Sequence, residues 1–436
     1  MASTDRGSSL FTDDVKLTPY WWEHMPQPEL SRITPPQKAD VVIVGSGYTG
    51  LSAALQTARG GRDTVVLDAD NAGFGCSTRN GGQISTSIKP GYTELARRYG
   101  RDRASGIIKE GHNSLRWVKE FVASEGIECD FRIAGRFHAA HSPSRYEALA
   151  QQLASQPKEL AVESQMVVRA EQRNELGTDA YFGGVVYPHH ASVDPGLFHS
   201  GLLQRAIAAG ARVIPHCPVT AIRREGARFV LSCAGRQVTA RNVVVATNGY
   251  TKGVTPWLRR RVIPIGSYII ATEPIPADLM ARLMPKNRIV SDTRKVVYYY
   301  RASPDGQRIL FGGRVSFDET DPKKSGPLLH AELTRIFPEL ANVRISHSWV
   351  GFVAYTFDEM MHIGVHDGIH YAMGYCGSGV GMAGYLGMRL GQLVLGLPEG
   401  KTALDGLPFP TRPFYFGNPW FLAPSVMYYR WADRHA

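Results

Sequence analysis

Three glycines near the start of the chain have the spacing of a dinucleotide-binding turn. Gly45, Gly47 and Gly50 form the pattern G-x-G-x-x-G within VVIVGSGYTGLSAAL. The first glycine permits a tight turn, the second lets the backbone approach a pyrophosphate, and the third lets a helix pack closely on a strand. The N-terminus of that helix then stabilises the diphosphate charge. The predicted nucleotide contacts include the residues beside these glycines, Ser46, Tyr48 and Thr49.

An acidic residue lies where such a turn needs one. Asp68 follows Gly50 by 18 residues and stands near the end of the run TVVLDA. A carboxylate at this offset accepts hydrogen bonds from a ribose 2′-OH and disfavours a 2′-phosphate. We therefore predict that Asp68 binds the ribose of the nucleotide and that its neighbour Ala69 also contacts the cofactor.

A second glycine-rich segment favours a flavin over a nicotinamide cofactor. Residues 73–83 read GFGCSTRNGGQ, with four glycines around polar side chains and one arginine. Such a loop can offer backbone N–H groups and a cation to a pyrophosphate or to a flavin edge. A surface loop without ligand is the alternative. The residues predicted to bind FAD here are Gly75, Cys76, Ser77, Arg79, Asn80, Gly81, Gly82 and Gln83.

A third glycine-rich turn, GYCGSGVG, follows a strand-like run at 369–373 and opens an apolar helix at 380–396. The positive end of that helix suits the N1–C2=O edge of a reduced flavin. Plain packing of helix against sheet is the alternative. The predicted FAD contacts here are Gly374, Gly377, Ser378, Gly379 and Val380, together with Thr247 and Gly249 of the VVVATNGY segment.

Short strands and helices must position these turns. The runs 39–44, 50–60 and 64–69 predict a strand, a helix and a strand, which form a βαβ unit. Further predicted helices cover 94–125, 144–157 and 197–209, and further strands cover 211–214, 241–246 and a hairpin-like stretch at 219–240. Alternating patterns over 262–272 and 294–314 predict antiparallel strands.

At these residues the chain resembles the D-amino-acid-oxidase-like superfamily of flavoproteins, which includes glycine and sarcosine oxidases, and within it the γ-glutamylputrescine oxidase-type branch. The resemblance runs from about Tyr20 to the C-terminus and is most specific in GFGCSTRNGGQ, VVVATNGY, YYYRASPDGQRILFGGR and GYCGSGVGMAGYLG. It implies an α/β (α+β, two-domain) fold, in which a Rossmann-like FAD-binding domain is joined to a discontinuous antiparallel-sheet substrate domain. It also implies a backbone contact from Val219 to the adenine.

The resemblance implies a discontinuous division of the chain. An N-terminal arm covers 1–38, the FAD-binding domain 39–100, 185–260 and 345–405, the substrate domain 101–184 and 261–344, and a C-terminal arm 406–436. We expect Tyr20, Trp21 and Trp22 to pin an otherwise irregular N-terminal arm. The aromatic C-terminal arm is expected to pack onto the body, with contact to a membrane surface as the alternative.

Two departures from the family pattern bear on the chemistry. No cysteine lies between 349 and 363, where related sarcosine oxidases tether the flavin, so non-covalent FAD is favoured. Val353 stands where amino-acid oxidases carry the arginine that clamps an α-carboxylate. A simple or ω-modified amine is therefore favoured as the substrate. A smaller departure, Ser378 in place of a histidine, leaves the exact amine open.

The expected reaction is oxidation of a CH–NH or CH–NH2 group by hydride transfer to flavin N5. It gives an imine and then an aldehyde or ketone, with O2 reduced to H2O2. An aromatic pocket would favour the neutral amine that this step needs. Tyr298 and Tyr300 share one face of a strand and are predicted to line it, with a core aromatic ladder as the alternative. Arg79 is the preferred cation for oxygen use, ahead of Lys295 and Arg301.

Two other functions stay open: a dehydrogenase that passes electrons to a quinone or electron-transfer protein, and an RNA-modifying flavoprotein. The second is suggested only by the net charge of +10, and the basic residues are scattered, so we expect no nucleic-acid partner. The five cysteines lack metal-like spacing, which predicts no metal site and a reducing, cytoplasmic setting. No run reaches the ~18 apolar residues of a membrane span.

Overall fold

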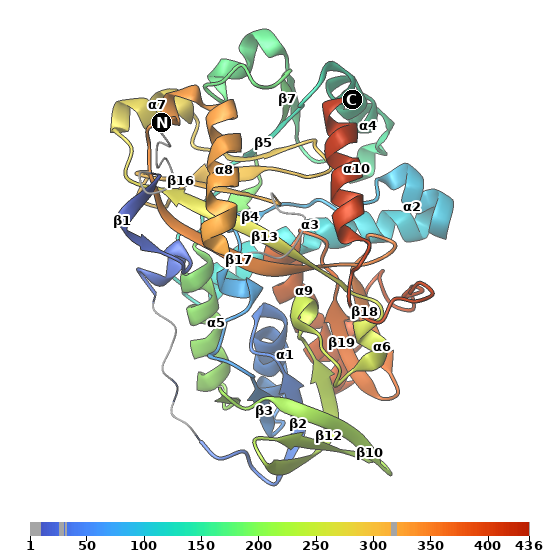
Figure 1. The fold of residues 1–436 in the computed structure, drawn as a ribbon. Coiled ribbons are helices and arrows are strands. Elements are labelled where there is room, and N and C mark those ends of the chain that lie inside the picture. Colours follow the sequence, from blue (N-terminus) through green and yellow to red (C-terminus); the bar gives the residue numbers. More distant parts are fainter. Residues whose placement is uncertain (1–9, 26–29, 31–32, 315–320, 436) are drawn as a thin grey trace.

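Two large β-sheets form the framework of the molecule. The structure is a computed structural model, and it describes residues 10–25, 30, 33–314 and 321–435. One sheet has nine strands and the other has eight. Figure 1 shows the nine-stranded sheet in the upper half of the view and the eight-stranded sheet in the lower half. The predicted α/β fold is confirmed.

The eight-stranded sheet contains the predicted βαβ unit. Its parallel centre consists of β9 (Arg212–Ile214), β3 (Thr64–Leu67), β2 (Lys38–Val44) and β12 (Arg236–Val245). The strands β10 (Val219–Glu225) and β11 (Arg228–Cys233) extend it as a hairpin beside β12, and β19 (Ile369–Met373) and β18 (His362–His366) complete it. The central strands are β-branched and buried on both faces, as parallel strands require.

Three helices cover one face of this sheet. They are α1 (Tyr48–Arg59), α5 (Pro195–Ala208) and α9 (Gly379–Leu395). The helices α1 and α9 pack very closely, because a Cβ atom at Gly387 would lie 2.4 Å from the Thr49 carbonyl oxygen. The starts of α1 and α9 are thereby brought to the same edge of the sheet.

The nine-stranded sheet is mixed and mostly antiparallel. Its order is β1 (Phe11–Lys16), β17 (Ile345–Tyr355), β13 (Ile263–Thr272), β16 (Ile309–Gly313), β15 (Tyr299–Ala302), β14 (Ile289–Asp292), β5 (Arg136–Ala139), β7 (Gly184–Tyr187) and β6 (Gln165–Val167). Helix α8 (Pro322–Ile336) packs on one face through Leu329 and Leu333. The opposite face is turned toward the 73–83 loop, since Gly351 of β17 approaches Arg79 and Cys76.

The remaining elements are peripheral to these two sheets. They are α2 (Tyr92–Tyr99), α3 (Arg101–Ser124), α4 (Pro143–Ser155), α6 (Pro256–Arg259), α7 (Ala277–Leu283), α10 (Leu422–Arg434), and the short strands β4 (Gln83–Ile84) and β8 (Ala191–Ser192). Among the described residues, no helix is long and apolar enough to cross a bilayer. All five cysteines are free thiols.

Several boundaries differ from the sequence predictions. Gly100, with φ of +83°, separates the predicted helix 94–125 into α2 and α3. The prediction of an irregular N-terminal arm is wrong for its strand β1, which pairs with β17 across more than 300 residues of sequence. Strand β17, expected in the cofactor domain, belongs to the nine-stranded sheet because it pairs with β13 along its length. The domain division otherwise stays a prediction.

The N-terminal and C-terminal arms differ in how closely they pack onto the rest of the protein. The prediction that the YWW run pins the N-terminal arm is confirmed, because Trp21 Nε1 donates to the Asn80 carbonyl and Trp22 Nε1 to Thr78 Oγ1. The C-terminal arm was expected to pack onto the body. It does so through Tyr415 and Val426, but Phe414, Trp420 and Trp431 are 80%, 67% and 58% exposed.

Candidate functional site

A cavity of about 370 Å³ opens at the carboxyl ends of the parallel strands. The residues that follow β2, β3 and β12 all line it, which is where nucleotides bind in doubly wound sheets. Its volume is in the range of cofactor pockets. Most predicted cofactor residues lie in its wall: Gly45, Ser46, Gly47, Tyr48, Thr49, Asp68, Ala69, Gly75, Cys76, Ser77, Asn80, Val219, Thr247, Gly377, Gly379 and Val380.

The other predicted contacts do not line this cavity: Gly50, Arg79, Gly81, Gly82, Gln83, Gly249, Gly374 and Ser378. Gly50 illustrates why. A Cβ atom there would lie 1.9 Å from the Gly45 carbonyl oxygen, so this glycine allows the turn to close. The Gln83 amide is likewise engaged, donating to the carbonyls of Val290 and Tyr300. Direct FAD contact by this group stays a prediction.

The start of α1 forms one end of the site. Gly45 has φ of +101°, and Gly47 caps the helix without any side chain. The first turn contains no acidic residue, so the positive helix end faces the cavity without a local countercharge from that turn. Ser77 Oγ accepts a hydrogen bond of 3.0 Å from the Tyr48 amide, which docks the 73–83 loop on the helix start.

The start of α9 lies at the same cavity. Its first turn also contains no acidic residue, and Gly377 precedes it with φ of +98°. The Tyr375 hydroxyl lies 2.6 Å from Thr49 Oγ1 of α1. The Gly374 amide donates to Asn248 Oδ1, which lies just beyond β12. Two positive helix ends are therefore held together beside one cavity.

Asp68 stabilises the glycine turn as well as lining the cavity. Its Oδ2 accepts hydrogen bonds from the amide and hydroxyl of Ser46, at 2.7 and 2.6 Å. Its Oδ1 accepts from the Asp70 amide at 3.1 Å. A carboxylate has further lone pairs for a ribose hydroxyl. The predicted ribose contact fits this placement and stays a prediction.

Arg79 holds the loop in place. Its Nε donates to the Phe74 carbonyl at 2.7 Å and its Nη1 to the Val350 carbonyl at 3.3 Å. The guanidinium carbon lies 4.7 Å from the Trp22 ring centroid and 4.4 Å from that of Phe74. Burial lowers the pKa of Arg79. In this position the side chain links the loop, β17 and the N-terminal arm, and its predicted part in oxygen use is untested.

The two tyrosines predicted to line the substrate pocket lie in the core. Tyr298 and Tyr300 are buried on the α8 side of the sheet, with ring centroids 5.4 and 5.5 Å from that of Phe311. The Tyr300 hydroxyl donates to Tyr181 at 3.3 Å. Neither residue lines the cavity. They occupy the positions expected of a core aromatic ladder.

The tyrosine between them faces the cofactor loop instead. Tyr299 presents its ring to Gly81, where a Cβ atom would lie 2.9 Å from the ring. Its hydroxyl is 2.8 Å from Ser267 Oγ, and burial raises its pKa. Side chains alternate along a strand, so Tyr299 must lie on the opposite face of the sheet from Tyr298 and Tyr300. The sequence pattern does not say which of the two faces is turned toward the cofactor loop.

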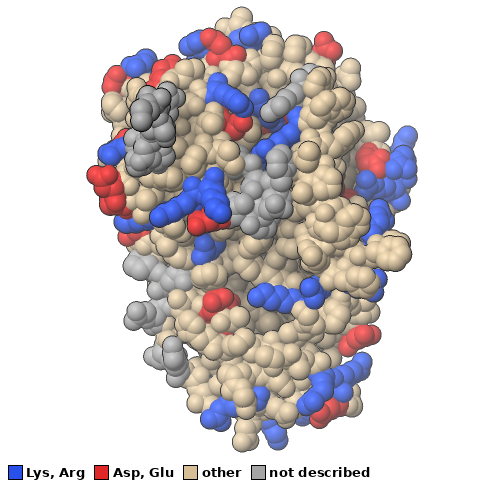
Figure 2. Space-filling view, viewed as in Figure 1, with Lys and Arg blue, Asp and Glu red and all other residues tan. Residues whose placement is uncertain are grey.

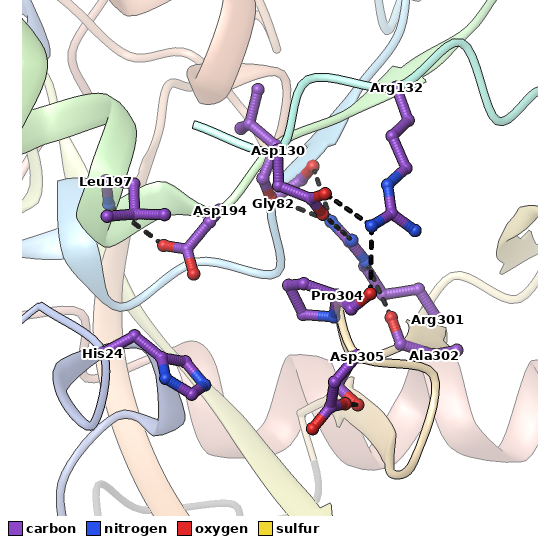
Figure 3. Close-up of polar contacts among 12 residues, drawn as sticks. His24, Gly82, Asp130, Arg132, Asp194, Leu197, Arg301, Ala302, Pro304 and Asp305 are labelled. Carbon is purple, nitrogen blue, oxygen red and sulfur yellow. Dashed lines mark hydrogen bonds and ion pairs between the residues drawn. The ribbon is translucent and has the colours of Figure 1, made fainter. Parts of the chain in front are cut away.

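The two other candidate cations lie outside the cavity wall. Lys295 is exposed. Arg301 is buried and donates to the carbonyls of Val193 and Ala302, and burial lowers its pKa to about 10. Figure 3 shows Arg301 beside Gly82, with Asp130 and Arg132 nearby. Arg301 thus fixes the end of the 73–83 loop.

The comparisons with known proteins decide the family. Residues 40–393 match the family described as DAO, FAD dependent oxidoreductase. The chain belongs to this family. Two curated relatives cover nearly the whole of this DAO-family chain. Gamma-glutamylputrescine oxidoreductase of Escherichia coli is 33% identical over 91% of this chain and 93% of its own. Probable oxidoreductase OrdL of Rhizobium meliloti is 31% identical over 90% and 92%.

Solved structures agree on the fold of this DAO-family protein. Glycine oxidase from Geobacillus kaustophilus superposes with a TM-score of 0.73, at 18% identity, over 87% of this chain and 99% of the other. L-proline dehydrogenase from P. horikoshii gives a TM-score of 0.68. These similarities concern the fold alone.

The cavity has the features that FAD requires. A Cβ atom at Gly47 would lie 2.8 Å from Ser77 Oγ, so this glycine lets the 73–83 loop pack against the start of α1 beside the cavity. The two helix ends suit a diphosphate and the electron-rich edge of a flavin ring. Residues Gly45–Thr49 would hold the diphosphate, Asp68 the ribose, and Gly377–Val380 the ring edge. Among the described residues, no group of three or more metal-ligating side chains is present.

Proposed function

We propose that this DAO-family protein binds FAD non-covalently and oxidises the C–N bond of a small amine. The observation that carries the proposal is that the N-terminal ends of α1 and α9 lie at one cavity, where Thr49 and Tyr375 connect them. Cys76 lines the cavity, but burial raises the pKa of its thiol to about 11. A protonated thiol is a poor nucleophile, which argues against a covalent tether. The free cysteines favour the cytoplasm.

The substrate proposed is an amine similar to γ-glutamylputrescine, or another primary or secondary amine. Support comes from the name of the Escherichia coli relative and from Val353, whose apolar side chain lines the cavity where an α-carboxylate would need a cation. When bound, FAD supplies the acceptor for the hydride that leaves the carbon beside the nitrogen.

The chain itself would bind and orient the amine and exclude water. The cavity wall is mainly apolar, and desolvation favours the neutral amine over its ammonium form. Only the neutral form has the lone pair that assists hydride departure. The reaction balances as amine, O2 and water giving aldehyde or ketone, ammonia or a smaller amine, and H2O2.

Anaerobic titration of the purified protein with amines tests this proposal. We expect flavin absorbance near 450 nm that bleaches with γ-glutamylputrescine or a related amine and returns with O2. Oxygen uptake and peroxide release measured on the same sample identify the acceptor. A protein that binds no flavin after reconstitution, or whose flavin no amine reduces, would overturn the proposal.

A dehydrogenase is the second candidate, and the C-terminal arm favours it. Trp420, Tyr428 and Trp431 leave aromatic surface exposed that could dock an electron acceptor. Amine-dependent bleaching without oxygen consumption would select this candidate. The RNA-modifying alternative gains no support from the face shown in Figure 2, where Lys and Arg are dispersed.

A further inference from the structure

A half-buried arginine, Arg136, lies on the face of the nine-stranded sheet that is turned toward the cofactor loop. Arg136 and His138 of β5 alternate with Phe137, which belongs to the core under α8. Ser291 of β14 pairs with His138, and Tyr299 of β15 pairs with Ser291, so all these side chains share one face. This is the face from which Gly351 and Tyr299 reach the 73–83 loop.

The Arg136 guanidinium is bonded only to neutral groups. Its Nε donates to Ser291 Oγ at 2.8 Å, and its Nη1 to Ser87 Oγ at 3.1 Å. Its Nη2 lies 3.2 Å from His138 Nδ1. No carboxylate lies within ion-pair distance of it among residues 10–25, 30, 33–314 and 321–435.

The two imidazoles near Arg136, those of His138 and His190, are held in their neutral form. Burial, then the charge of Arg136, lowers the pKa of His138 well below its ordinary value and that of His190 to about 3. Burial also lowers the pKa of Arg136 itself. Arg136 is half-buried and none of the partners named above is anionic, so its guanidinium can pair with an anionic ligand.

Hydrogen bonds connect this arginine to the candidate site. Ser87, which accepts from Arg136, also accepts through its carbonyl a 2.9 Å bond from Ser378 Oγ. Ser378 is the N-cap residue of α9, and its neighbours Gly377 and Gly379 line the cavity. The guanidinium therefore lies between the substrate sheet and the helix start that would face the flavin ring.

We propose that Arg136, with Ser87 and Ser291, forms a subsite for a carboxylate carried by the amine substrate at the end remote from the oxidised C–N bond. The planar guanidinium can bind a carboxylate through two parallel N–H groups, and both hydroxyls can turn to donate. This inference rests on the proposed amine oxidation. It explains how a substrate could be anchored although Val353 offers no cation for an α-carboxylate.

Two probes, one with a carboxylate and one without, test the subsite. N-(γ-glutamyl)putrescine carries the acid and putrescine does not. Steady-state kcat and KM for both would be measured on the FAD-loaded wild type, Arg136→Gln, Arg136→Lys and a control, Arg116→Gln. Arg116 is exposed on α3 and donates to Asn113 Oδ1, so the control removes one positive charge elsewhere.

We expect Arg136→Gln to raise KM for the acidic probe by ~10–100-fold, the range of a lost charge-assisted hydrogen bond, and to leave KM for putrescine within ~3-fold. Arg136→Lys should recover part of the loss, and Arg116→Gln should behave as wild type. Equal losses for both probes, or no loss for either, would overturn the subsite and leave the amine oxidation intact.

A binding measurement keeps the two proposals separable. Glutarate, a dicarboxylate without an amine, should perturb the flavin spectrum of the wild type and bind at least ~10-fold more weakly to Arg136→Lys. If no amine reduces the flavin but glutarate binds through Arg136, the proposed function fails and the subsite stands. If glutarate does not bind the wild type, the subsite is overturned.

Discussion

The hydroxyl groups of Thr49 and Tyr375 lie 2.6 Å apart and connect the first turn of α1 to the segment that opens α9. The two residues are separated by more than 300 positions in the sequence and are both buried. The Tyr375 hydroxyl also donates to the Ala372 carbonyl at the end of β19. This contact fixes the distance between the two helix ends that a flavin dinucleotide must reach at once.

Removal of this contact should weaken FAD binding. Tyr375→Phe deletes one hydroxyl and leaves Thr49 Oγ1 without its partner, so we expect the dissociation constant for FAD to rise ~3–10-fold. Titration of the apoprotein by flavin fluorescence measures it. Tyr92→Phe, on α2 away from the cavity, is the control. An unchanged constant in Tyr375→Phe would show that the helix ends do not depend on this contact.

Gly47 should be intolerant of even one methyl group. Its φ of −76° suits alanine, but the added Cβ would lie 2.8 Å from Ser77 Oγ. The loop must then shift, at a cost of ~1–3 kcal/mol, and FAD should bind ~5–100-fold more weakly. Gly91→Ala is a matched control, because Gly91 also begins a helix at negative φ and has open space around it. Equal flavin affinity in the two variants would contradict the predicted diphosphate cradle.

The glycine turns were predictable because each depends on local backbone geometry. G-x-G-x-x-G after a β-branched strand indicates a nucleotide turn without any knowledge of distant contacts. The loop at 73–83 and the turn at 374–380 could be identified in the same way, and most of their residues line the cavity.

The rest of the site depends on contacts between distant segments. Tyr298, Tyr299 and Tyr300 alternate between two faces, and only the position of α8 shows which face is core. Arg136 stands alone in AGRFHAA, and its partners Ser87 and Ser291 come from other strands and loops. Strand β1 is formed by pairing with β17 and has no strong local signal.

Arg79 should act on stability and loop position rather than on the reaction with oxygen. Arg79→Lys loses the bond to the Phe74 carbonyl and the stacking with Trp22. We expect the free energy of unfolding to fall by ~1–3 kcal/mol and FAD affinity to fall with it. Denaturant unfolding and stopped-flow reoxidation of the reduced enzyme separate the two roles. Normal stability with slow reoxidation would instead support the predicted part in oxygen use.

Substitutions along β15 test which face of the strand serves the substrate. Tyr298→Phe and Tyr300→Phe change only the core side, so kcat/KM should stay within ~3-fold of wild type. Tyr299→Phe removes the hydroxyl bonded to Ser267 beside the cofactor loop, and kcat/KM should fall ~3–10-fold. The reverse order, with Tyr298 more sensitive than Tyr299, would support the sequence prediction for Tyr298 and Tyr300.

His190 should make the fold sensitive to acid. Burial lowers its pKa from 6.5 to about 3, with the charge of Arg136 adding to the effect, so the folded state keeps this imidazole neutral. Between these two values the unfolded chain binds more protons than the folded chain, and stability must fall as the pH decreases from 6.5. From pH 6.5 to 5 the loss should reach ~2 kcal/mol for this residue. Thermal unfolding of wild type and His190→Gln across this range measures it.

The variant should lose part of that pH dependence, because glutamine does not titrate and can still bond Thr86. His189→Gln, at the adjacent exposed position, removes the smallest of the charges that lower the pKa of His190, so most of the slope should remain. His141 and His347, whose pKa values burial also lowers to about 4, should maintain a residual slope in His190→Gln. A wild-type slope in that variant would show that His190 is not the neutral, buried group that the structure describes.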